Sequence, residues 1–263
     1  MTAAWRLDAH THLDLYEDAA LTDRAIAEID ARRILTVAMS VDPAGYARTV
    51  ALAARSRWII PCFGIHPWQA HRFDDALAEH AAALAATPII GEVGLDYVLD
   101  PDPAHHPAQR RVLAHMLRAA AISDRIVSLH TKGAEADVAA ALQRHRVRRP
   151  IIHWYSGSHE TLAALLEHGA WCSFGSAMPV SAELRALAAA TPLERTLSET
   201  DNPGAAQWAL GRVGLPGELD AVIAALGDIH GLSIDAMAAI IRDNWRRLIA
   251  GDARLAPWRA LLD

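Results

Sequence analysis

Short apolar segments alternate with longer amphipathic segments along most of the chain. The apolar segments are four to eight residues long and often rich in β-branched residues, which is typical of buried strands. This pattern predicts eight strands, at Trp5–His10, Ile34–Ser40, Trp58–Ile65, Pro88–Val93, Ile126–His130, Pro150–His153, Ala170–Phe174 and Arg195–Thr200.

Segments rich in Ala and Leu, with helical spacing of their apolar residues, separate these strands. They predict helices at Thr22–Arg33, Pro43–Arg57, Asp74–Ala86, Pro107–Ile122, Ala134–Arg146, Ser158–His168 and Ser181–Ala190. Two further helical segments, Glu218–His230 and Ser233–Ile249, follow the last strand. Ser158, Ser181 and Ser233 stand where helix N-caps are expected, and Gly169 and Gly231 follow helical segments, as residues that end helices do.

Eight strands alternating with helices favour parallel pairing through helical crossovers. We expect a closed (β/α)₈ TIM barrel of eight parallel strands with additional C-terminal helices. An open, doubly wound sheet is the rival, but eight repeats in about 250 residues favour the barrel. Because neither a linker nor a low-complexity tract divides the sequence, we expect residues 1–263 to form one domain.

Composition narrows the class of protein. Hydrophobic residues make up 52% of the 263 residues and charged residues 21%, which is ordinary for a globular protein. The net charge of −6 argues against a generally basic, nucleic-acid-coating surface, although it is compatible with an enzyme that binds phosphates through metal ions. Cys62 and Cys172 lie in apolar segments and read as buried core residues. The sequence shows neither a signal-peptide pattern nor a membrane-spanning segment, so we expect a cytoplasmic protein.

Residues of metal-ligand type follow five of the predicted strands. The six residues are His10, His12, Glu92, His130, His153 and Asp201. Residues i and i+2 at a strand end point the same way, so His10 and His12 converge. In a TIM barrel the carboxyl ends of the strands meet at one rim, where clustered histidines and carboxylates are costly to desolvate without a cation. Mixed imidazole and carboxylate ligands suit Zn, Mn, Fe or Ni better than Ca.

Six segments that carry these residues resemble motifs of the TatD family of metal-dependent DNases, within the amidohydrolase-like TIM barrels. They are Asp8–Asp14, Gly64–Pro67, Gly91–Asp96, His130–Lys132, His153–Gly157 and Ser198–Pro203, and they span nearly the whole chain in the family's order. The resemblance implies two divalent metal ions, with Mg, Mn, Zn and Ni all open. It implies that His10 and His12 hold one ion, that Glu92 bridges, and that His130 and His153 surround the second.

The resemblance also implies a function, namely hydrolysis of DNA phosphodiester bonds, of the 3′–5′ exonuclease type, by a metal-activated water. Single-stranded DNA or a 3′ end is then the substrate, and Asp201 is both a ligand and the general base beside the catalytic Glu92. His66 lies near the substrate phosphate in that family. From residue type and position, Lys132 is a further candidate for holding phosphate oxygens, and Trp154 and Tyr155 for stacking on bases.

Two departures from the family pattern keep other readings open. Trp154–Tyr155 replaces the usual Cys-Phe pair, and the family's Asn-Glu-Pro motif is absent where the chain reads Gly211–Glu218. One alternative is a metal-dependent ester or amide hydrolase, such as an aminoacyl-tRNA deacylase. Another is a metal-binding component of a multiprotein complex, for example in defence or repair, with low activity of its own. Glu92, at a position where many binuclear barrels have a modified lysine, favours the nuclease. Retention of all six ligand positions argues against an inactive component.

Overall fold

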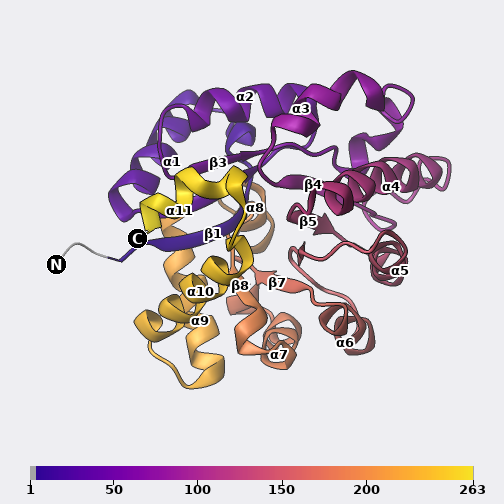
Figure 1. Ribbon diagram of the computed structural model, residues 1–263. Helices are drawn as coiled ribbons and strands as arrows, with labels where there is room; N and C mark the ends of the chain where they lie inside the picture. Colours follow the sequence, from indigo (N-terminus) through magenta and orange to yellow (C-terminus); the bar gives the residue numbers. More distant parts are fainter. Residues whose placement is uncertain (1–3, 263) are drawn as a thin grey trace.

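A computed structural model describes residues 4–262 of the chain (Figure 1). Within these residues eight parallel strands follow one another in sequence order. They are β1 (Arg6–Thr11), β2 (Ile34–Met39), β3 (Ile59–Cys62), β4 (Ile90–Gly94), β5 (Val127–His130), β6 (Pro150–Ile152), β7 (Trp171–Phe174) and β8 (Thr196–Ser198). Nearly every strand residue is buried, as is usual for parallel strands covered by helices.

The strands do not form one continuous closed sheet, so the prediction of a single eight-stranded sheet is not met in that form. The hydrogen bonds give one sheet of β1–β3 and another of β4–β8, in a TIM-barrel-like order. A single parallel bridge, between Phe63 and Ile90, joins β3 to β4. Just after the carboxyl end of β8, the Asp201 N–H donates to the carbonyl of His10 in β1 at 2.9 Å. The two strands β1 and β8 are therefore neighbours.

Side-chain hydrogen bonds connect β8 and β1 where the backbone ladder is interrupted. The Ser198 hydroxyl donates to the Leu7 carbonyl at 2.6 Å, and the Asp8 carboxylate accepts from the Thr200 N–H at 2.9 Å and from the Thr200 hydroxyl at 2.6 Å. These polar groups are buried and would be costly without partners. Side chains thus replace part of the backbone ladder at this seam.

Helices surround the strands in Figure 1. The α-helices are α1 (Ala19–Arg32), α2 (Pro43–Ala53), α3 (Ala81–Ala86), α4 (His106–Ser123), α5 (Glu135–His145), α6 (His159–Glu167), α7 (Ala182–Ala190), α8 (Gly204–Leu210), α9 (Leu219–His230), α10 (Ile234–Ile249) and α11 (Ala256–Leu262). The side chains of Ser158, Ser181 and Ser233 accept hydrogen bonds at the starts of α6, α7 and α10, which confirms the predicted N-caps. In the described part of the chain, no single helix is long and apolar enough to cross a membrane. One pair of helical segments, Pro216–His230 and Ile234–Ile249, has the length and apolar composition of a membrane span when taken together. The two segments are bent by 98° relative to each other.

Two helical predictions differ from the structure. The single helix expected at Asp74–Ala86 is instead a 3₁₀ turn at Leu77–His80 followed by the short α3. The short helices α8 and α11 were not expected, since seven residues are too few for helical periodicity to stand out.

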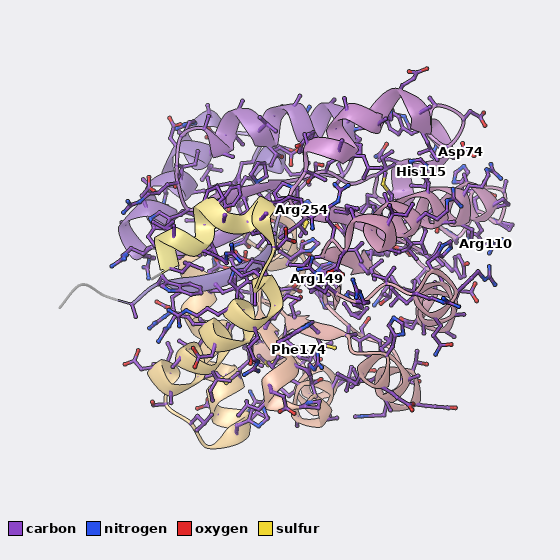
Figure 2. All side chains as sticks on the ribbon, viewed as in Figure 1. Asp74, Arg110, His115, Arg149, Phe174 and Arg254 are labelled. Carbon is purple, nitrogen blue, oxygen red and sulfur yellow. The ribbon has the colours of Figure 1, made fainter. Side chains whose placement is uncertain are left out.

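Polar contacts hold the C-terminal segment against the amino ends of β5 and β6. Arg149 and Arg254, which are labelled in Figure 2, both donate to the buried carboxylate of Asp252, each at 2.9 Å. Arg254 also donates to the backbone carbonyl of Ser123 at 2.9 Å. These contacts lie at the amino ends of the strands, whereas the residues of metal-ligand type lie at the carboxyl ends.

Candidate metal centre

The buried carboxylate of Glu92, on β4, lies at the middle of the predicted site. Its Oε2 atom is 3.3 Å from Nε2 of His10 and 3.2 Å from Nε2 of His12. Its Oε1 atom faces a different set, at 2.9 Å from Nδ1 of His130, 3.3 Å from Nε2 of His153 and 3.5 Å from Nε2 of His66. One carboxylate therefore faces two groups of imidazoles, one with each oxygen.

Asp201 completes the group at the Oε2 side. Its Oδ1 atom is 3.4 Å from Nε2 of His12 and 3.9 Å from Nε2 of His10, and the two imidazole nitrogens are 3.3 Å apart. Two nitrogens bound to one zinc ion, each at about 2.0–2.1 Å in tetrahedral geometry, lie roughly 3.3 Å apart. The donor types and spacing of these three residues thus fit a divalent transition-metal ion.

The histidines of the centre have polar partners on their outer nitrogens. The second ring nitrogen of His130 is 2.9 Å from Asp96 Oδ2, and that of His153 is 3.2 Å from Glu199 Oε1. Nδ1 of His10 lies 3.1 Å from the Ser128 hydroxyl. Metal-binding histidines usually have such an outer partner, which fixes the ring and its tautomer. These outer partners therefore hold the three histidine rings in the orientation in which they would bind a metal ion.

The buried carboxylates and histidines of this cluster shift one another's pKa values, and His12 keeps its proton at neutral pH. Burial alone would raise the pKa of Glu92, but the imidazoles of His66, His153 and His10 outweigh it and hold that pKa well below its usual value. Burial lowers the pKa of His12, yet hydrogen bonds and the charges of Asp201 and Glu92 raise it to about 10. A metal ion would replace such protons, because imidazole binds metals in its neutral form.

Close backbone approach and unusual dihedral angles accompany the site. A Cβ atom on Gly64 would lie 2.2 Å from the backbone oxygen of Glu92, so only glycine fits there without displacement. Trp154 and Asp201 adopt the left-handed region, with φ of 40° and 49°, which is uncommon for residues other than glycine. Each such residue costs on the order of 1–3 kcal/mol, and such residues cluster at functional sites.

The residues predicted to contact substrate fall in different environments. His66 is buried beside Glu92, whereas Lys132 is partly buried and donates from Nζ to the Ser156 hydroxyl at 3.0 Å. Trp154 is partly exposed, and its ring centroid lies 6.4 Å from that of His153. Tyr155 is fully buried and donates to the Ser158 carbonyl at 2.7 Å, so its predicted role in base stacking does not match its position in the core.

Two acidic residues beside the centre, Asp96 and Glu199, had no predicted role. Asp96 and Glu199 are buried and contact His130 and His153, although both lie in segments that carry the family resemblance. Trp68 donates from its indole N–H to Asp96 at 2.8 Å. An acidic residue inside or just after an apolar strand is the sequence signal that points to Asp96 and Glu199, since a buried carboxylate needs a charged or donating partner.

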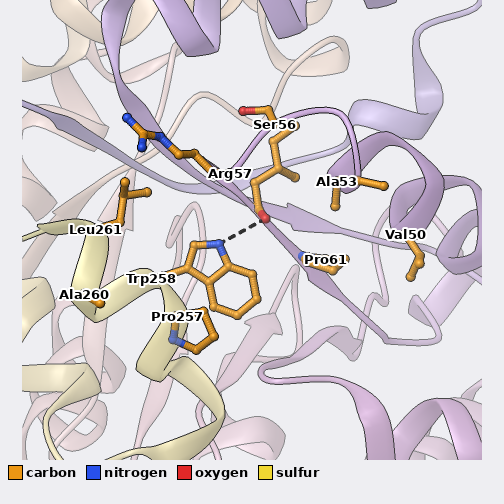
Figure 3. A pocket seen from close by; sticks show the side chains of 11 residues that line it. Val50, Ala53, Ser56, Arg57, Pro61, Pro257, Trp258, Ala260 and Leu261 are labelled. Carbon is orange, nitrogen blue, oxygen red and sulfur yellow. Dashed lines mark hydrogen bonds between the residues drawn. The ribbon is translucent and has the colours of Figure 1, made fainter.

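A separate cavity lies away from this centre. It has a volume of about 540 Å³ and lies between α2, β3 and α11, with Val50, Ala53 and Trp258 in its wall (Figure 3). The indole N–H of Trp258 donates to the carbonyl of Ile59, the first residue of β3, at 3.2 Å. This cavity is thus at the amino end of β3, whereas His66 follows the carboxyl end.

Comparison with known proteins agrees with the geometry of the centre. The family model described as "TatD related DNase" matches residues 7–250. The chain belongs to the TatD family. It is a metal-dependent hydrolase, as is "Uncharacterized metal-dependent hydrolase YcfH" of Escherichia coli (strain K12), which is 27% identical over 257 residues, or 94% of this chain and 96% of that protein.

Two further TatD-family proteins extend the comparison. The "3'-5' ssDNA/RNA exonuclease TatD" of Edwardsiella piscicida is 33% identical over 153 residues, which cover 53% of this chain and 56% of that protein. The crystal structure of YJJV, a TATD homolog from Escherichia coli K12, superposes with a TM-score of 0.81 at 25% identity, covering 92% of this chain and 97% of that one. The TIM-barrel-like arrangement is therefore that of the family.

Proposed function

We propose that this TatD-family protein is a divalent-metal-dependent deoxyribonuclease that removes nucleotides from the 3′ end of single-stranded DNA. The observation that carries the proposal is the position of Glu92, whose two oxygens face separate groups of histidines. Such a carboxylate can bridge two ions, and paired ions are a recurrent device for phosphodiester hydrolysis. The printed name of the Edwardsiella piscicida relative supports the same substrate class.

The ligands divide between the two oxygens of Glu92. His10, His12 and Asp201 would hold one divalent ion on the Oε2 side, and His130 and His153 would hold the other on the Oε1 side. When bound, the ions would stabilise negative charge on the phosphate and lower the pKa of a water molecule. Mn, Zn and Ni suit this set of imidazole and carboxylate donors, whereas Mg, which prefers oxygen donors, rests on the resemblance to the family alone.

Residues of the chain would supply proton transfer and substrate binding. The Asp201 side chain is 16% exposed and that of Glu92 only 2%, so Asp201 is the carboxylate that a substrate or water can reach. Asp201 would accept or steer the proton of the attacking water, as a general base within hydrogen-bond reach does. Lys132 and His66 would hold non-bridging phosphate oxygens or a neighbouring phosphate through charged hydrogen bonds.

A cleavage assay with a matched charge control tests this proposal. Single-stranded DNA labelled at its 5′ end is incubated with Mg²⁺ or Mn²⁺ and wild-type protein, Asp201→Asn or Asp235→Asn. Asp235 is an exposed acid on α10, paired with Arg6, and provides the control for loss of one negative charge. We expect wild type and Asp235→Asn to shorten the DNA stepwise from its 3′ end. Asp201→Asn should be slower by about 10²–10⁴-fold.

Each other outcome selects a different function. Equal cleavage by wild type and Asp201→Asn would remove Asp201 as the general base. Intact DNA together with hydrolysis of an aminoacyl ester would favour the ester or amide hydrolase. Failure to cleave either substrate with metal bound would favour a low-activity component of a multiprotein complex.

A further inference from the structure

Exposed apolar side chains gather around the end of the barrel that carries the metal centre. Among residues 4–262, ten large hydrophobic side chains are exposed, and eight of them lie in connections that follow the carboxyl ends of strands. Such clustering at one rim is a mark of a binding surface, since single exposed hydrophobic residues are normally scattered. The more exposed of the two tryptophans among them is Trp208, on α8, which is 76% exposed.

Three aromatic rings run from the metal centre toward this surface. The ring centroids of His153 and Trp154 are 6.4 Å apart, and those of Trp154 and Trp208 are 5.7 Å apart at an interplanar angle of 72°. His153 is one of the candidate ligands and contacts Glu92. Trp154 is next to His153, and Trp208 is next to Trp154. The pair therefore lies next to the candidate metal ligands.

The inner tryptophan is held in place by a residue that also positions a metal ligand. The backbone N–H of Trp154 donates to Glu199 Oε1 at 3.0 Å, and the same oxygen is 3.2 Å from Nδ1 of His153. The backbone of Trp154 lies in the left-handed region, with φ of 40°. A fixed aromatic ring loses little entropy when a flat group packs against it.

We propose that Trp154 and Trp208 form a stacking subsite for the nucleobase of the 3′-terminal nucleotide. This inference rests on the proposed function and names how that site recognises its substrate. The phosphate would meet the metal centre, while the uncharged base packs against the exposed face of the indole pair. Base–aromatic stacking tolerates any base, because every base has a flat π-face. The chain's net charge of −6 fits recognition through aromatic contact in addition to charge.

Two oligonucleotides that differ in one base test the subsite. The first ends at its 3′ side in a normal nucleotide, and the second ends in an abasic nucleotide with the same phosphodiester. Rates of 3′ removal are measured for wild type, Trp208→Ala, Trp208→Phe and Ile122→Ala. Ile122, on α4, is 88% exposed and lies outside the rim, so its truncation controls for loss of an exposed apolar side chain.

The preference for the base-bearing end is the measured quantity. We expect wild type and Ile122→Ala to prefer the normal end by about tenfold or more in kcat/KM, and Trp208→Ala to lose that preference. Trp208→Phe should retain part of it, because a phenyl ring still stacks. Equal rates on both oligonucleotides in the wild type would overturn the subsite and leave the nuclease proposal standing.

A binding measurement separates failure of the subsite from failure of the nuclease proposal. Calorimetric titration compares a deoxynucleoside 5′-monophosphate with deoxyribose 5-phosphate, using metal-loaded wild type and Trp208→Ala. If the protein cleaves no DNA, base-dependent binding that is lost in Trp208→Ala would still support the subsite. Equal binding of both ligands by the wild type would overturn it.

Discussion

His10 and His153 stack face to face, with ring centroids 3.7 Å apart and an interplanar angle of 12°, and each directs Nε2 toward a different oxygen of Glu92. An imidazole binds a metal through a lone pair that lies in the plane of its own ring. Two nearly parallel rings therefore suit two neighbouring ions better than one shared ion. This relationship supports our proposal of a binuclear centre.

Asp96 should tune the affinity of the centre through His130. We expect Asp96→Asn to weaken metal binding by about 10–100-fold, because an outer carboxylate fixes the ring and raises its basicity. Competition with a metal indicator measures the affinity, and Asp102→Asn, in the same connection between β4 and α4, is the control. An affinity equal to that of wild type would show that Asp96 does not act through His130.

Metal binding should become tighter as pH rises. His12 has a pKa near 10 in the metal-free fold against 6.5 for an ordinary histidine, and the pKa of His153 is also raised. Burial lowers both values, but the charges and hydrogen bonds of Glu92 with Asp201 or Glu199 outweigh it. Because metal must displace these protons, uptake should release protons, and calorimetry in buffers of different ionisation enthalpy measures the number released.

The same protonation sets how the metal-free protein responds to pH. A histidine whose pKa is raised on folding stabilises the fold fully below its unfolded pKa of about 6.5 and less as pH rises toward its folded pKa. The Tm of metal-free protein should therefore fall between about pH 6.5 and about pH 8.5, while the gain in Tm on adding metal grows. A gain that stays constant over this range would contradict the assignment of His12.

Gly64 should be required for the position of Glu92. A methyl group at Gly64 would meet the backbone of Glu92, and relief of that contact must move β4 or the segment after β3. We expect Gly64→Ala to lower the free energy of unfolding by about 1–3 kcal/mol and to weaken metal binding as well. Urea denaturation measures the first effect, and Gly204→Ala is the control because the space around Gly204 is open. Wild-type stability and affinity in Gly64→Ala would refute this close packing.

Lys132 is the only lysine in the sequence, which makes its role directly measurable. Amine-reactive reagents can modify only Lys132 and the chain's amino terminus, and peptide mass spectrometry distinguishes the two. If Lys132 binds phosphate, single-stranded DNA should slow its modification without changing that of the amino terminus. Lys132→Met should also raise KM for DNA by about tenfold. Modification at the same rate with and without DNA would assign Lys132 a structural role through Ser156.

The sequence was most informative about the site where residues of metal-ligand type lie at the ends of predicted strands. The six predicted ligands each follow or lie in an apolar strand, and parallel strands bring their carboxyl ends together, so their meeting could be anticipated. The resemblance to the TatD family then supplied their roles, which the geometry is compatible with. The interruption of the sheet between β8 and β1 could not be anticipated, because it depends on where Asp8 and Ser198 direct their side chains.

Local backbone conformation limited the remaining predictions. Tyr155 was predicted to stack on bases, but it is fully buried and follows Trp154, whose backbone is left-handed. Glu199 and Asp201 are likewise two residues apart, yet one lies behind His153 and the other faces His12. The sequence alone does not show that these two carboxylates face different histidines. Trp208 went unassigned because α8 is too short to show which face it exposes.

The central claim is that Glu92 bridges two divalent ions, and anomalous diffraction from crystals loaded with Mn²⁺ or Zn²⁺ tests it most directly. We expect two anomalous peaks, one beside each oxygen of the Glu92 carboxylate, with His10 and His12 at the first and His130 and His153 at the second. A single peak that excludes Glu92, or peaks only outside this cluster, would contradict it.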